Sequence, residues 1–182
     1  MKYLFLLGII VGSCNCFGRY SVGSFPDTSL GRTILNQVLS KDREGHNLIV
    51  FTAVTKNEIQ SLMSRKPDLL WEYIRKVYGI SDDIGISNIL SEHSLNRLLF
   101  KVKTKTITLI NTTENEKGDA VLHEVKQPLR PAIADFVLVL YKKSDEKCLV
   151  YYHILNEGFS LALLERKNKF WEIVDFKTET IE

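Results

Sequence analysis

The sequence has little of what marks a specialised class of protein. Its 182 residues include only three cysteines and four prolines, which excludes a disulfide scaffold and a proline-rich linker. Lysine and arginine number 24 against 22 aspartates and glutamates, for a net charge of +2. This balance gives no electrostatic case for nucleic acid or an anionic membrane as the main partner. The composition is that of one ordinary globular domain.

Motifs for common catalytic and metal sites are also missing. The four histidines are scattered along the chain, and no HExxH or CxxC pattern is present, so the sequence predicts no metal and no cofactor. No serine lies in a Gly-x-Ser-x-Gly turn. Cys148 and His153 are five residues apart on one predicted strand, which places them on opposite faces unless a bulge intervenes. For His153 we expect a partly buried, hydrogen-bonded side chain. Asp82 and Asp83 could hold a cation or activate water, but at a helix start we expect them to cap it.

The only long apolar run stands at the start of the chain. Met1-Lys2-Tyr3 is basic and Leu4–Val11 is apolar, which is typical of an export signal and too short to span a bilayer. Val11-Gly12-Ser13-Cys14 resembles the lipobox of bacterial lipoproteins. This resemblance covers 14 residues and implies that Cys14 becomes the lipidated N-terminus. The alternative is ordinary signal-peptidase cleavage between Cys14 and Gly18.

These segments predict the domain organisation and the destination. We expect residues 1–16 to be the signal, 17–26 a tether and 27–182 a single domain. The destination is the periplasm or cell envelope if the source is bacterial, and secretion if it is eukaryotic. If Cys14 is lipidated, a disulfide between Cys16 and Cys148 becomes conceivable. Asn111-Thr112-Thr113 matches an N-glycosylation acceptor, which matters only in a eukaryotic source.

The C-terminal part predicts an antiparallel meander. Its four strands are Ala134–Lys142, Lys147–Leu155, Phe159–Arg166 and Phe170–Phe176, joined by short polar turns. The strands that are apolar on both faces suit the centre of the sheet, and the last strand suits an edge because it carries Glu172 and Asp175. Strict alternation puts Asp175 on the same face as Trp171.

The first half predicts helices around one buried strand. Helices are expected from Pro26-Asp27 to Ser40, over Lys56–Ser64 after a Thr55 cap, over Asp68–Tyr78 between Pro67 and Gly79, and from Ser81 to Leu99. Strands are expected over Asn47–Val54, Phe100–Ile110 and Ala120–Lys126, with Asn111–Gly118 as a polar loop. We therefore predict an α+β fold, with N-terminal helices packed on one face of a curved, mainly antiparallel sheet.

Two groups of side chains are candidate binding residues. The first could line a pocket for a small apolar ligand, although core packing explains it equally well; it comprises Tyr151, Tyr152, His153, Phe159 and Trp171. The second is a basic stripe of Lys101, Lys103 and Lys105. The stripe could touch an acidic partner, or it could be a solvated or protected strand face.

Three functions fit these observations. The first is an exported, non-enzymatic interaction module, with or without a lipid anchor, for an unidentified protein partner. The second is a carrier of a small apolar ligand. The third is a small hydrolase that uses Asp82, Asp83, His93 or His153. The lack of a catalytic motif favours the first.

Overall fold

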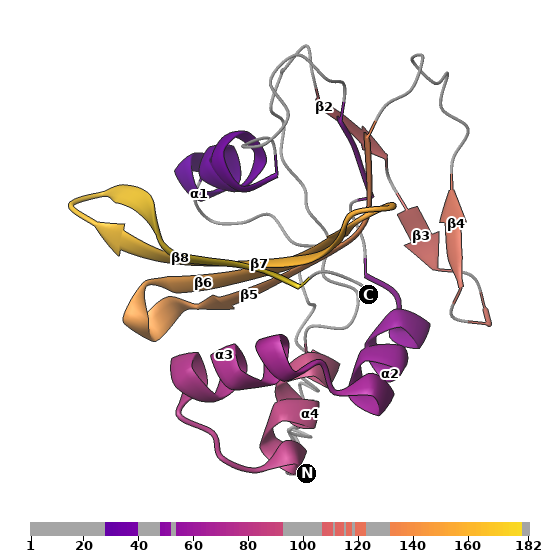
Figure 1. Cartoon of the computed structure of the whole chain (residues 1–182), viewed down its shortest axis with the longest axis horizontal. Coiled ribbons are helices and arrows are strands. Elements are labelled where there is room, and N and C mark those ends of the chain that lie inside the picture. Colours follow the sequence, from indigo (N-terminus) through magenta and orange to yellow (C-terminus); the bar gives the residue numbers. More distant parts are fainter. Residues whose placement is uncertain are drawn as a thin grey trace, which may run out of the picture.

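The fold is a curved sheet between two layers of helices (Figure 1). The computed structural model describes residues 28–39, 48–51, 54–92, 107–110, 112–114, 116–117, 119–122 and 132–179. The predicted export signal and tether lie outside them. Within these residues the predicted α+β class is confirmed, because N-terminal helices pack on a sheet that ends in a C-terminal meander.

The main sheet has six strands. Their spatial order is β2 (Ile107–Ile110), β1 (Leu48–Phe51), β5 (Ala132–Lys142), β6 (Lys147–Ile154), β7 (Gly158–Lys167) and β8 (Phe170–Glu179). The last four strands form the predicted antiparallel meander, and β8 lies at the edge as expected.

The predicted mainly antiparallel character is confirmed, and β1 supplies the parallel part of the sheet. Strand β1 runs parallel to both β2 and β5. Chain order explains this, because three helices separate β1 from β2 and carry the chain back over one face of the sheet. Such a crossover joins parallel strands, whereas short turns join antiparallel ones.

The helices cover both faces of the sheet, not one. They are α1 (Thr28–Thr33), the π-helical turn η1 (Ile34–Val38), α2 (Lys56–Arg65), α3 (Asp68–Tyr78) and α4 (Asp83–Glu92). Figure 1 shows α1 on one side of the sheet and α2 to α4 on the other. We call the resulting cores the α1 core and the α3 core.

Side-chain alternation in the central strands requires two layers. In β5, Val137 and Val139 enter the α1 core, whereas Leu138 and Leu140 enter the α3 core. Successive strand residues point to opposite faces, so a strand that is apolar throughout needs cover on both. The π-helical turn helps on the α1 side, because Leu39 N–H donates to the Ile34 carbonyl over one extra residue. The apolar side chains of this segment are all buried: Leu30, Ile34, Leu35, Val38 and Leu39.

Local signals place the helix ends of the α3 side as predicted. The Thr55 hydroxyl accepts from Glu58 N–H while the Glu58 carboxylate accepts from Thr55 N–H, a complete capping box. Helix α3 runs from Asp68 to Tyr78, with Pro67 before it and Gly79 in the left-handed conformation after it. Helix α4 begins at Asp83, and residues 93–99 of the longer predicted helix lie outside the described part.

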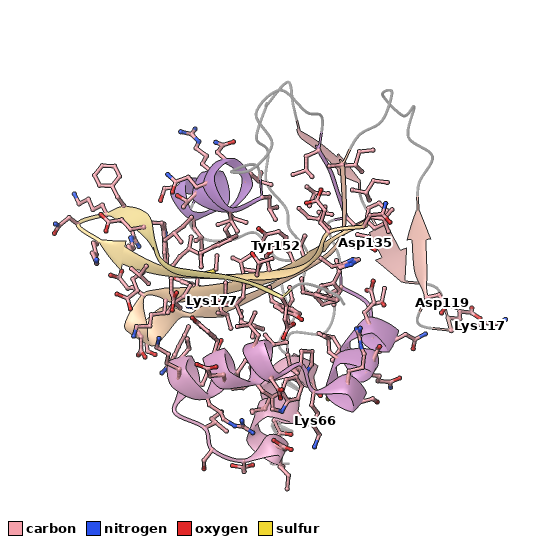
Figure 2. All side chains as sticks on the ribbon, viewed as in Figure 1. Lys66, Lys117, Asp119, Asp135, Tyr152 and Lys177 are labelled. Carbon is pink, nitrogen blue, oxygen red and sulfur yellow. The ribbon has the colours of Figure 1, made fainter. Side chains whose placement is uncertain are left out.

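The segment expected to be a polar loop contains a strand. Residues Thr112–Glu114 (β3) pair with Ala120–Leu122 (β4) as a separate two-stranded hairpin. Asn57 at the start of α2 donates to the Lys117 carbonyl at 3.2 Å and to Asp119 Oδ1 at 3.0 Å. Figure 2 shows Lys117 and Asp119 at the end of this hairpin. Polar residues therefore pair as strands here, with their turn tied to α2.

A β-bulge changes the predicted faces of β8. Leu163 pairs with Asp175 and the next residue, Leu164, pairs with Ile173, so Val174 is the extra residue. Trp171 packs in the α1 core as its alternation requires. Asp175 is instead transferred to the other face, where it accepts a short hydrogen bond from the Tyr73 hydroxyl of α3. The prediction that Asp175 shares a face with Trp171 was wrong because alternation fails at a bulge.

The Tyr73–Asp175 contact should make stability depend on pH at both extremes. Burial and the Asp175 carboxylate raise the pKa of Tyr73 to about 12, against about 10 for an unfolded tyrosine. Stabilisation from Tyr73 is thus fully present below about pH 10 and is lost as the pH rises toward 12. The hydrogen bond from Tyr73 lowers the pKa of Asp175, so stabilisation from Asp175 is lost only in acid, below the ordinary carboxylate range.

We expect Tyr73→Phe to flatten this profile. The variant lacks the titrating hydroxyl, so its free energy of unfolding in urea should fall less between pH 10 and 12 than that of the wild type. Its acid-side decline should be shallower as well. Parallel curves for the two proteins from pH 3 to 12 would contradict a coupled Tyr73–Asp175 pair.

The backbone of the turn between β7 and β8 leads to a second prediction. Asn168 and Lys169 both have positive φ, 51° and 74°, as a two-residue hairpin turn of type I′ requires. Asparagine tolerates this conformation, whereas a lysine there is strained by about 1 kcal/mol. Lys169→Gly should therefore raise the free energy of unfolding in urea by about 1 kcal/mol. Asn168→Gly, the matched control, should gain less; a destabilised Lys169→Gly protein would show that the turn is unstrained.

Candidate functional site

The five side chains predicted to line one pocket are divided between the two faces. Tyr152 and Trp171 belong to the α1 core. The Tyr152 hydroxyl donates to the Val38 carbonyl at 3.2 Å, and Trp171 packs edge-to-face on Tyr141 with ring centroids 5.8 Å apart. The other three, Tyr151, His153 and Phe159, lie together on the α3 side of the sheet. Only three of the five predicted pocket residues therefore lie together in the structure.

Tyr151, His153 and Phe159 form an aromatic stack across β6 and β7. The Phe159 ring lies parallel to Tyr151 at 5.1 Å between centroids and 4.5 Å from the His153 ring. Arg65 at the end of α2 places its guanidinium carbon 5.6 Å from the Phe159 ring centre, within the range of a cation–π contact. We call these three rings with their charged neighbours Asp135, Glu179 and Arg65 the β6 cluster.

Asp135 reaches His153 because of a bulge in β5. Ala134 pairs with Ile154 and Phe136 pairs with His153, which leaves Asp135 as the extra residue. Its Oδ1 lies 2.6 Å from Nδ1 of His153. Figure 2 shows Asp135 where β5 runs toward β1. The prediction that His153 is partly buried and hydrogen-bonded is confirmed, with 17% of its side chain exposed.

In a catalytic triad, too, an aspartate binds one imidazole nitrogen of the histidine and orients the ring. A triad also needs a nucleophilic side chain beside the other imidazole nitrogen of His153. Cys148 on β6 and Ser160 on β7 are candidates for this role. Cys148 lies in the α1 core, on the opposite face. Ser160 pairs with Tyr152 on that face too, with its hydroxyl 3.4 Å from that of Thr178. Among the described residues, neither Cys148 nor Ser160 completes the triad.

Tyr151 is not a plausible acid or base in this cluster. Its side chain is buried, and its hydroxyl is 3.5 Å from Oε2 of Glu179 on β8. Burial is the main cause that raises the pKa of the Tyr151 hydroxyl, and the charge of Glu179 adds to it. A phenol that stays protonated here can donate a hydrogen bond but does not exchange a proton near neutral pH.

Cys148 is also unsuited to catalysis because its side chain is buried. Its free thiol is fully buried in the α1 core. Burial without a charged partner raises the pKa of the thiol, so the reactive thiolate does not form. The opposite faces predicted for Cys148 and His153 are confirmed.

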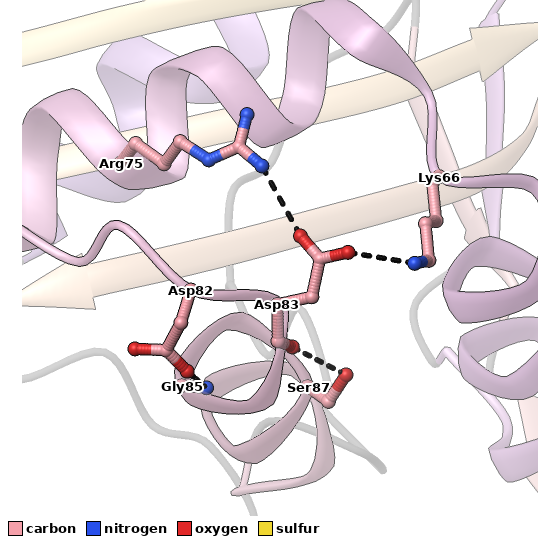
Figure 3. A network of polar contacts seen from close by, with 6 residues as sticks. All are labelled: Lys66, Arg75, Asp82, Asp83, Gly85 and Ser87. Carbon is pink, nitrogen blue, oxygen red and sulfur yellow. Dashed lines mark hydrogen bonds and ion pairs between the residues drawn. The ribbon is translucent and has the colours of Figure 1, made fainter.

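Asp82 and Asp83 have the structural roles expected at a helix start. Figure 3 shows both at the N-terminus of α4. Asp82 Oδ1 accepts from Gly85 N–H at 2.7 Å. Asp83 binds Lys66 Nζ at 2.6 Å and Arg75 Nη2 at 3.1 Å. These cations, Lys66 foremost, lower the pKa of the Asp83 carboxyl. Asp83 thus ties α4 to α2 and α3 and is already neutralised.

Several predicted site residues lie outside the described part of the chain. They are Cys14, Cys16, Lys101, Lys103, Lys105, His93 and Asn111, and their assignments stay predictions. In the part that is described, no cluster of three or more potential metal ligands occurs, and no helix is long and apolar enough to cross a membrane.

One exposed aromatic side chain was not predicted from the sequence. Phe170 on β8 is 72% exposed, although it was expected only as a residue of an edge strand. Its signal was present in the chain, because Phe170 follows the polar turn Lys167-Asn168-Lys169 and alternates with Glu172 on the face away from Trp171. Asp135 was missed for another reason: a bulge has no reliable local signature.

Comparisons of the chain with protein-family models, with curated proteins and with solved structures find no match. The assignment of a function therefore depends on the geometry of the described residues.

We expect the Cys148 thiol to resist modification in the folded protein. In a chain with Cys14→Ala and Cys16→Ala, a thiol reagent at pH 8 should label nothing until urea is added, and then one thiol per chain. Cys148→Ser should lower the free energy of unfolding by about 1–3 kcal/mol, since it buries a hydroxyl in an apolar core. Rapid labelling without denaturant would contradict this account.

Proposed function

We propose that this chain is an exported, non-enzymatic module that binds a protein partner. The observation that carries the proposal is that three side chains of reactive type are already used in the fold. Cys148 is buried, Asp83 is paired with two cations, and Asp135 is held by His153. We therefore expect the protein to act by binding a partner through its surface residues.

The export part of the proposal depends on the N-terminal sequence alone. Met1–Val11 has the pattern of a signal, and Cys14 is the proposed lipidation site. Lipidation would hold the mature domain at a membrane while leaving its surface free to bind. Without it, the same module would lie in the periplasm of a bacterium or be secreted by a eukaryotic cell.

The two alternative functions have less support. A carrier of a small apolar ligand needs a cavity lined by aromatic side chains. Here Tyr152 and Trp171 are packed on one face while Tyr151 is stacked on Phe159 on the other. A hydrolase would use the Asp135–His153 pair, but Cys148 and Ser160 both lie on the opposite face of the sheet.

A fourfold variant separates binding from catalysis. Asp82→Asn, Asp83→Asn, His93→Gln and His153→Gln remove the candidate acids and bases while keeping hydrogen-bonding side chains. A tagged wild-type chain, cross-linked through lysines in the cell that produces it, should give a discrete adduct with another protein. The folded fourfold variant should give the same adduct as the wild type.

Two results would overturn the proposal. One is a wild-type chain that forms no adduct with another protein. The other is a hydrolytic activity of the purified wild type that the folded fourfold variant lacks, which would favour the hydrolase. The single variant Asp82→Asn is the matched control for stability, because asparagine caps a helix as well as aspartate does.

A further inference from the structure

We draw no further inference here: the strongest candidate, the Asp135–His153 pair of the β6 cluster with the Phe159 ring beside it, belongs to the site already described, where the bulge in β5 and the ring packing account for it.

Discussion

The central strands of this protein are apolar on both faces, and the rest of the structure depends on that constraint. Leu138 and Val139 are neighbours in β5, yet they enter different cores. Such a sheet cannot leave one face to water without exposing a row of large apolar side chains. The chain therefore supplies two helical layers, α1 with its π-helical turn on one side and α2 to α4 on the other.

Two bulges each bring a carboxylate into a hydrogen bond on the α3 side of the sheet. One makes Asp135 the extra residue of β5, beside His153. The other, at Val174, turns Asp175 toward Tyr73 of α3. Each bulge gives a carboxylate a partner at the margin of a core, where an unpaired charge would be costly. The Asp135–His153 and Tyr73–Asp175 contacts therefore have a structural explanation, and residues of catalytic type at these positions are weak evidence for catalysis.

The sequence by itself determined the elements whose signals are local. The Thr55 cap, helix Asp68–Tyr78 between Pro67 and Gly79, and the four strands of the meander follow from capping residues, alternation and turn residues that are close neighbours in the chain. The opposite faces of Cys148 and His153 follow from the same alternation. Only the tertiary structure decided that β1 pairs in parallel, that α1 covers the face opposite α2 to α4, and that Asp175 crosses to the α3 side. These features depend on contacts between residues tens of positions apart. Such contacts are chosen by how the finished layers pack, and no short stretch of the chain encodes them.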